Sequence, residues 1–223
     1  MRHLVALLAH GSPDQRSAAA ARELATRVAG ELPEADVRCA FLDNDEPSLE
    51  QLVRGAQPNG VTVVPLFLND AFHARVDVPA AVAAAREHCD AITVTDSLAH
   101  QPSLIAWLDG RLPTGVPVVM ATAGTRDESA RAQLRRLAAA WASTRGTDVR
   151  VAYASMAEPT VGQALEELGP SAAVAAYLLF PGTLVDRIEA EASGRAITPP
   201  LAGSAALVEV IAALAAGARP AQP

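Results

Sequence analysis

The feature that most constrains the fold of this 223-residue chain is an internal repeat. Three pairs of segments align in order: 9–14 with 122–127, 46–48 with 158–160, and 65–68 with 176–179. The offset between the copies drifts only from 113 to 111 residues, which indicates duplication followed by divergence. The sequence therefore predicts two tandem similar domains, residues 1–113 and residues 117–217, on either side of a Pro- and Gly-containing break at 113–117.

Within each half, short apolar segments alternate with longer amphipathic ones. The expected strands cover residues 3–9, 36–42, 61–68, 91–95, 117–122, 148–154 and 172–179. The expected helices cover residues 15–32, 47–56, 78–88, 102–112, 127–144, 159–168, 184–193 and 204–216. Strands that are apolar throughout and separated by helices are typical of a parallel sheet covered on both faces. The predicted fold class is therefore α/β, with a parallel sheet and helices on both faces in each domain.

Charge and hydropathy exclude several classes of partner. The net charge is −7 and no run of Lys or Arg occurs, so we expect no nucleic-acid partner. No apolar stretch is long enough to cross a bilayer, so we expect no membrane partner. Residues 3–9 continue into His10 without a small-residue cleavage site, which favours a buried strand over a signal peptide. We therefore expect a cytoplasmic protein. Cys39 and Cys89 have no Cys-x-x-Cys spacing and are interpreted as free thiols.

Three loops of the first half follow expected strands, and ligands of parallel α/β sheets bind beyond the carboxyl ends of the strands. The loops are 10–14, 43–46 and 69–73, and they carry His10, His73 and several carboxylates. A histidine pair with one carboxylate suits a divalent ion such as Fe²⁺, Co²⁺ or Zn²⁺. The alternative is that each histidine is only a polar loop residue beside a helix.

The first of these loops also has the composition of a helix start. Gly11 permits an unusual backbone angle, and Ser12 or Asp14 can cap the helix that follows. Backbone amides at such a helix start can also bind a carboxylate or a phosphate. Gly-x-Gly-x-x-Gly and a Walker lysine are absent from the sequence, so a nucleotide site is not predicted.

Three segments together resemble the sirohydrochlorin chelatases, the ferro- and cobaltochelatases of sirohaem and cobalamin synthesis. They are Leu8-Ala9-His10-Gly11-Ser12, then Phe41-Leu42-Asp43 with Glu46-Pro47-Ser48-Leu49, and then Val64-Pro65-Leu66-Phe67-Leu68 with His73 and Asp77-Val78-Pro79. The resemblance covers about 110 residues closely, and the second half resembles the weaker repeat of the two-domain members.

The resemblance implies a metal site and a substrate site. His10 and His73 match the two catalytic, metal-handling histidines, and Asp43 stands where the family usually has a glutamate, as a third ligand or an orienting carboxylate. Ser12 and Arg75 are the expected substrate contacts. The second half is degenerate, because Ala123 and Leu184 replace the two histidines; one active centre is expected, in a cleft that the C-terminal domain closes.

The implied activity is insertion of Fe²⁺ or Co²⁺ into sirohydrochlorin. Metal and tetrapyrrole are both substrates, so no permanently bound cofactor is expected. A monomer is expected because an internal duplication can replace a homodimer. Two alternatives stay open at this point: a non-catalytic carrier of metal or tetrapyrrole, and an α/β binding module in which the histidines have no metal chemistry.

Overall fold

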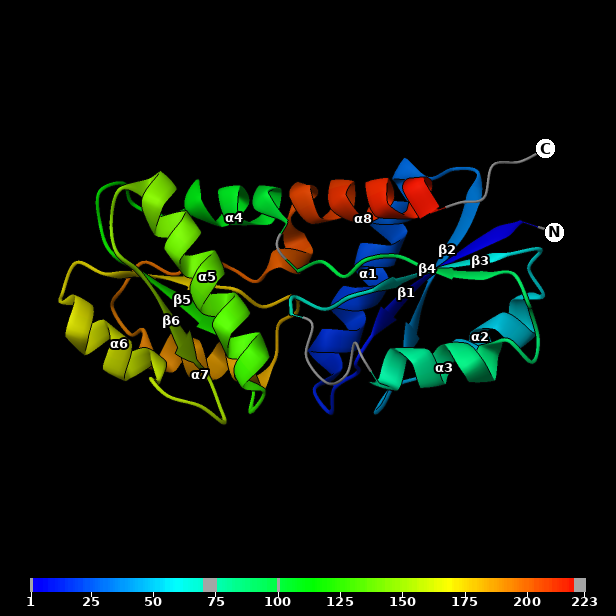
Figure 1. The fold of residues 1–223 in the computed structure, drawn as a ribbon, viewed down its shortest axis with the longest axis horizontal. Coiled ribbons are helices and arrows are strands. Elements are labelled where there is room, and N and C mark those ends of the chain that lie inside the picture. The colour runs from blue at the N-terminus through cyan, green and yellow to red at the C-terminus, as the bar shows by residue number, and fades with distance from the viewer. Residues whose placement is uncertain (1, 70–75, 100, 219–223) are drawn as a thin grey trace. The chain divides into compact units, whose positions relative to one another are not determined.

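The computed structural model describes residues 2–69, 76–99 and 101–218 of the chain (Figure 1). The chain divides into two compact units, and each is described by itself. Unit 1 consists of Met1–Ala99 with Ala205–Pro223, and unit 2 consists of His100–Ser204. Among the described residues, no helix is both long enough and apolar enough to span a membrane.

Unit 1 contains a four-stranded parallel sheet in the order β2-β1-β3-β4. Its strands are β1 (His3–Ala9), β2 (Ala35–Phe41), β3 (Val61–Pro65) and β4 (Ile92–Val94). The central strand β1 is buried over Leu4–Ala9 because it has a hydrogen-bonded neighbour on each side and helices on both faces. At its start, the His3 ring lies 2.8 Å from the Thr62 hydroxyl, which is a structural role for this histidine.

Two pairs of helices cover this sheet. Leu4, Ala6 and Leu8 pack with α2 (Leu49–Ala56) and α3 (Val78–Ala85) in one core cluster. Because side chains alternate along a strand, the intervening residues of β1 face the other side. That side is covered by α1 (Gln15–Glu31) and α8 (Ala205–Ala218), which contact each other (Figure 1).

Unit 2 repeats this arrangement around a three-stranded parallel sheet in the order β6-β5-β7. Its strands are β5 (Val118–Thr122), β6 (Val149–Tyr153) and β7 (Ala173–Ala176). Val119 and Ala121 pack with α6 (Val161–Leu168) and α7 (Thr183–Glu191). The remaining helices of unit 2, α5 (Glu128–Arg145) and α4 (Pro102–Asp109), contact β6 and β7, and the 3₁₀ turn η2 (Leu201–Gly203) leads toward α8.

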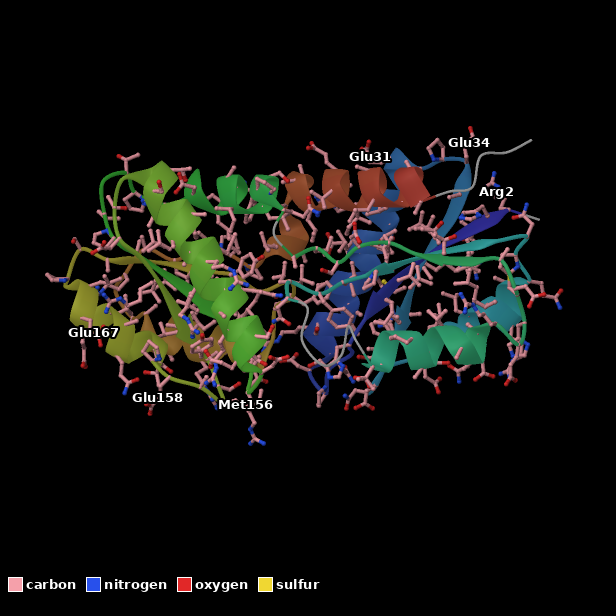
Figure 2. The ribbon with its side chains drawn as sticks, in the orientation of Figure 1. Arg2, Glu31, Glu34, Met156, Glu158 and Glu167 are labelled. Carbon is pink, nitrogen blue, oxygen red and sulfur yellow. The ribbon has the colours of Figure 1, made fainter. Side chains whose placement is uncertain are left out.

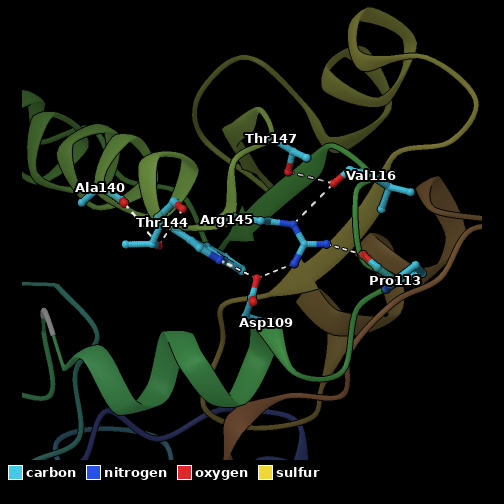
Figure 3. Close-up of polar contacts among 8 residues, drawn as sticks. Asp109, Pro113, Val116, Ala140, Thr144, Arg145 and Thr147 are labelled. Atoms are coloured by element: carbon cyan, nitrogen blue, oxygen red, sulfur yellow. Dashed lines mark hydrogen bonds and ion pairs between the residues drawn. The ribbon is translucent and has the colours of Figure 1, made fainter.

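The compact units differ from the halves of the sequence repeat by the exchange of one helix. Helix α4 ends the first repeat in the sequence but packs in unit 2, whereas α8 ends the second repeat but packs in unit 1. Polar contacts fix α4 to α5, because Asp109 accepts a 2.8 Å hydrogen bond from the Trp141 indole and forms an ion pair with Arg145 (Figure 3). The predicted domains 1–113 and 117–217 thus follow the repeat. In the structure, unit 1 ends at Ala99 and resumes at Ala205, and unit 2 occupies the residues between them.

The predicted α/β class and the order of strands and helices are confirmed, but α3 and α4 end three residues early, at Ala85 and Asp109, and two strands are shorter than expected. Strand β3 ends at Pro65 rather than 68, and β7 ends at Ala176 rather than 179. The physical reason is the same in both halves. The Phe67 amide turns back to the Pro65 carbonyl at 3.0 Å, and the Leu178 amide turns back to the Ala176 carbonyl at 2.8 Å. These tight turns end the sheet pairing although the sequence stays apolar.

The two halves also share local geometry at matching positions. Ser48 and Thr160 each cap a helix through a capping box, and Asn44 and Met156 each have a positive φ, of 61° and 60°. The peptide bonds that precede Pro47 and Pro159 are both cis. Met156, in the loop after β6, is 63% exposed and is labelled in Figure 2. The internal repeat therefore extends to individual backbone angles.

Candidate active site

Three strands of unit 1 end at one edge of the sheet. Ala9 of β1 lies opposite Phe41 of β2, and Leu8 lies opposite Pro65 of β3. The loops that begin at His10, at Leu42 and at Leu66 therefore start beside each other, as predicted from the parallel order. His73 and Arg75, which are predicted on and just after the third loop, lie outside the described residues.

Backbone hydrogen bonds continue past the sheet and join the first two loops. The Leu42 amide donates to the Ala9 carbonyl at 3.0 Å, and the Asp43 amide donates to the His10 carbonyl at 2.8 Å. Both His10 and Asp43 have exposed side chains. The structure thus places two of the three predicted metal ligands on loops joined by backbone hydrogen bonds, where a ligand from solvent can reach them.

Gly11 is the residue that allows this close approach. Its φ is +93°, and a Cβ at this position would lie 1.6 Å from the Asp43 carbonyl oxygen. A side chain of any kind would therefore collide with the backbone of the neighbouring loop, in addition to the unfavourable angle. This close contact requires a glycine at the position that follows His10.

Ser12 is held by two hydrogen bonds within these loops. Its backbone amide donates to Asp45 Oδ2 at 3.1 Å, and its hydroxyl oxygen accepts from the Asp14 amide at 3.1 Å. Asp14 then caps α1 by accepting from the Arg16 amide at 3.0 Å, which confirms the predicted helix start. A serine oxygen that accepts a hydrogen bond still has its own hydrogen to donate, so the Ser12 hydroxyl retains one donor for a ligand.

Asp45 was not predicted as a site residue, although the loop that contains it was. The signal was present in the repeat: position 45 corresponds to position 157, where the second half has alanine. A carboxylate that occurs only in the half that keeps His10 points to a role at the site. Comparing the two repeats identifies the residue from the sequence, but the partner of the carboxylate is visible only in the fold.

The carboxylate of Asp43 is oriented by its own loop, and a basic side chain lies behind it. Asp43 Oδ1 accepts a 2.8 Å hydrogen bond from the Asn44 amide. Arg22 donates to the Glu46 carbonyl at 3.0 Å, and its guanidinium carbon lies 5.2 Å from the centre of the Phe41 ring. The Arg22 cation thus braces the end of the Asp43 loop from the side of α1.

Cys39 lies on β2, the strand that leads to Asp43, but it is not a candidate metal ligand. Its thiol is buried and lies 2.9 Å from the Ala21 carbonyl. Burial raises the pKa of the Cys39 thiol to about 12, so the group is protonated at neutral pH. Metal ions bind the thiolate rather than the thiol. Cys89, the other free cysteine, is partly buried.

The corresponding edge of unit 2 has the same backbone and different side chains. A Cβ on Gly124 would lie 1.8 Å from the Ser155 carbonyl oxygen, as at Gly11. Ala123 occupies the position of His10, and Ser155 occupies the position of Asp43 and donates to the Ala123 carbonyl at 2.8 Å. Arg187 of α7 donates to the Ala154 carbonyl at 2.8 Å. The second half therefore keeps the loop frame without the histidine and the carboxylate.

The described residues do not complete a metal centre by themselves. No group of three or more His, Cys, Asp or Glu side chains that could hold an ion occurs among residues 2–69, 76–99 and 101–218. This is the outcome expected when one of three predicted ligands, His73, lies outside those ranges. The described part of the site consists of His10 and Asp43, with Ser12 and Asp45 beside them.

A family model matches the chain twice, over residues 4–114 and 117–217, and its description is CbiX. The chain belongs to the CbiX family. The two matches follow the internal repeat and together span nearly the whole chain. A relative, the sirohydrochlorin cobaltochelatase of Methanosarcina acetivorans, is 28% identical over 90 residues, which cover 39% of this chain and 69% of the relative. The family membership confirms the resemblance inferred from the three sequence segments.

Solved structures of similar fold extend the comparison to the full length. SirB from Bacillus subtilis with Fe³⁺ superposes with a TM-score of 0.78 at 20% identity, covering 96% of this CbiX-family chain and 94% of SirB. The structure of CbiX described as the terminal enzyme for biosynthesis of siroheme in denitrifying bacteria has a TM-score of 0.71 at 20% identity, covering 99% of this chain and 100% of that chain. At such identities the likeness establishes a shared two-domain α/β fold.

Proposed function

We propose that this CbiX-family protein inserts a divalent metal ion, Fe²⁺ or Co²⁺, into sirohydrochlorin. The observation that supports the proposal is the 2.8 Å hydrogen bond between the Asp43 amide and the His10 carbonyl, which joins the two loops that carry this imidazole and this carboxylate. The name of the Methanosarcina acetivorans relative gives the same substrate. Of the two similar structures, SirB is described with Fe³⁺ and CbiX is described as an enzyme of siroheme biosynthesis.

In the proposed site, His10, His73 and Asp43 bind the incoming ion. Histidine is the commonest protein ligand for divalent transition metals, and a carboxylate lowers the charge of the complex and orients a neighbouring imidazole. Insertion exchanges two pyrrole N–H protons for one M²⁺, so the products are the metallated ring and two protons. Neutral His10 and His73 release the ion to the ring nitrogens and accept these protons as general bases.

Ser12 and Arg75 are the proposed contacts for the substrate carboxylates. The Ser12 hydroxyl retains one hydrogen to donate, and it lies two residues from His10 near the start of α1. A guanidinium at position 75 would bind a carboxylate through charge-assisted hydrogen bonds. The Ser12 amide already donates a hydrogen bond to Asp45, so the hydroxyl rather than the amide is the proposed donor to the substrate.

The test is an anaerobic assay in which the purified protein is mixed with sirohydrochlorin and an excess of Co²⁺ or Fe²⁺. The visible spectrum of the tetrapyrrole is followed over several turnovers. His10→Ala and His73→Ala are each expected to slow insertion by roughly 10²–10⁴-fold, the usual contribution of a general base. His88→Ala is the matched control, because His88 lies near Glu50, at 3.4 Å, rather than at the carboxyl edge.

The outcomes separate the enzyme from the carrier. Catalytic metallation that is lost in both variants and kept in His88→Ala supports the proposal. Wild-type protein that binds Co²⁺ but yields no more than one metallated ring per molecule would instead establish a carrier. Absence of both metal binding and metallation in folded protein would rule out metal chemistry at His10 and leave a binding module.

We also propose that the protein acts as a cytoplasmic monomer without a permanently bound cofactor. The internal duplication supplies two similar domains in one chain, which removes one reason for dimerisation. Light scattering coupled to gel filtration tests the assembly directly, since a monomer has a mass of 23.1 kDa. A mass near twice that value, independent of concentration, would contradict the monomer.

A further inference from the structure

The Asp45 side chain makes a contact outside its own loop, with the backbone of Ser12. Its Oδ2 accepts a 3.1 Å hydrogen bond from the Ser12 amide, and its own amide donates to the Asp43 carbonyl at 2.8 Å. One half-buried carboxylate thus joins the loop of His10 to the loop of Asp43. The contact lies two residues beyond each of the two described metal-binding candidates.

The second repeat shows how the same frame is held when no metal chemistry is needed. There the Ser155 hydroxyl, at the position of Asp43, donates to the Ala123 carbonyl at 2.8 Å and joins the two loops directly. Ala157, at the position of Asp45, has no side-chain oxygen that could accept from an amide. Equivalent residues thus bind the His10 and Ala123 carbonyls, through the Asp43 backbone amide and the Ser155 hydroxyl, and the first repeat adds the side-chain contact of Asp45.

The difference follows from the chemistry of the substitution at position 43. A serine donates a hydrogen bond to a carbonyl, but an ionised carboxylate is only an acceptor. With Asp43 in place of serine, the side chain cannot donate to the His10 carbonyl, and the Asp43 backbone amide donates to it instead, at 2.8 Å. Asp45 adds a side-chain connection by accepting a hydrogen bond from the other loop, which leaves the Asp43 carboxylate available for an ion.

We propose that Asp45 is a positioning residue that holds the His10–Ser12 loop so that His10 and Asp43 bind the same divalent ion. This inference rests on the proposed function, because it assigns Asp45 a role toward the metal of that reaction. Asp45 acts through the Ser12 amide and does not itself touch the ion. Groups that orient metal ligands in this way typically change metal affinity by 10- to 100-fold when they are removed.

The experiment measures Co²⁺ affinity by the absorption of the bound ion, together with kcat and KM for metal insertion. Asp45→Ala is expected to weaken Co²⁺ binding at least tenfold and to lower kcat, while KM for sirohydrochlorin changes less than threefold. Asp45→Asn is expected to stay within about threefold of wild type in affinity, because its amide oxygen can still accept from Ser12. Asp45→Ser, which is too short to reach the Ser12 amide, replaces the alanine variant if that variant does not fold.

Ser155→Ala is the matched control, because it removes the corresponding connection in the repeat that lacks His10. It is expected to leave Co²⁺ affinity unchanged. Equal losses in Asp45→Ala and Asp45→Asn would indicate an effect of charge and overturn the positioning role, as would equal losses in Asp45→Ala and Ser155→Ala. Wild-type affinity in a folded Asp45→Ala protein would also overturn it.

Failure of the inference and failure of the proposed function give different results. If wild-type protein neither binds Co²⁺ nor metallates sirohydrochlorin, the proposed function is wrong, and so is the role of Asp45 that rests on it. If wild-type protein does both and Asp45→Ala does both equally well, only the role of Asp45 is wrong.

Discussion

The backbone amide of Asp43 donates a 2.8 Å hydrogen bond to the carbonyl of His10; the two residues lie two positions beyond the last paired residue of β2 and one beyond that of β1. The register of the sheet therefore sets the relative position of the two residues. Loops that are rigid at their first residue can present ligands with little loss of conformational entropy on binding. Mutations can test this loop frame, its carboxylate, the helix exchange and the buried thiol separately.

Gly11→Ala is expected to destabilise the protein by about 2–4 kcal/mol and to abolish Co²⁺ binding. The new Cβ would lie 1.6 Å from the Asp43 carbonyl oxygen at a φ of +93°, so the two loops must separate. Gly124→Ala in the second repeat has almost the same clash, 1.8 Å from the Ser155 carbonyl oxygen. Thermal unfolding should show similar losses for both, whereas the Co²⁺ titration should fail only for Gly11→Ala.

Asp43→Asn is expected to weaken Co²⁺ binding by roughly 10- to 100-fold without loss of the fold. The amide keeps the hydrogen bond from Asn44 but removes the negative charge that favours a cation. Asp36→Asn serves as the control. Asp36 lies near the start of β2, beside Arg38, and its substitution makes the same change of net charge. Equal weakening in the two variants would show a general electrostatic effect rather than a ligand at position 43.

Arg145→Leu is expected to reduce the free energy of unfolding by about 1.5–3 kcal/mol, because it removes the hydrogen bonds of a buried guanidinium, although its partner Asp109 is 39% exposed. The Arg145 side chain is only 4% exposed and binds Asp109 together with the carbonyls of Pro113 and Val116 (Figure 3). These contacts attach α4 and the break between the repeats to α5. Urea unfolding should detect the loss.

The control for Arg145 is a surface ion pair in the same unit. Arg150 pairs with Glu167, and both side chains are about half exposed, at 47% and 55%. Exposed pairs typically contribute about 1 kcal/mol or less, so Arg150→Leu should change the urea midpoint only slightly. Comparable losses in the two variants would contradict the role assigned to the buried Arg145.

The buried thiol of Cys39 is expected to make the fold less stable at high pH. Burial raises the pKa of Cys39 from its ordinary value of 9.0 to about 12, so between these values the unfolded chain loses a proton that the folded protein keeps. The unfolded state then binds fewer protons, and stability falls by about 1.4 kcal/mol per pH unit from this group. Below pH 9 both states keep the proton and the effect disappears.

The measurement is the difference in urea stability between wild type and Cys39→Ala from pH 8 to pH 11. Burial also raises the pKa of Tyr177, but that contribution is common to both proteins and cancels in the difference. The mutant should be less stable at pH 8 because of the lost side chain, and the gap should narrow as the pH rises. A gap that stays constant across this range would contradict the assigned pKa.

Much of the site could be predicted from the amino-acid sequence. His10 and Asp43 follow expected strands, and parallel strands present their carboxyl ends at one edge, so their proximity follows from topology. Asp14 was also predicted as a capping residue and caps α1. The contact between Asp45 and Ser12 could not be predicted, because it joins residues 33 positions apart in two irregular loops.

The sequence by itself determined the class of fold, the alternation of strands and helices, and the two-fold repeat. These properties follow from the spacing of apolar residues and from local turn chemistry, which act over a few residues. Only the tertiary structure decided that α4 and α8 are exchanged between the compact units, and that strands β3 and β7 end where the chain turns. The physical reason is that both outcomes depend on contacts between distant segments, such as Asp109 with Arg145, which no local pattern encodes.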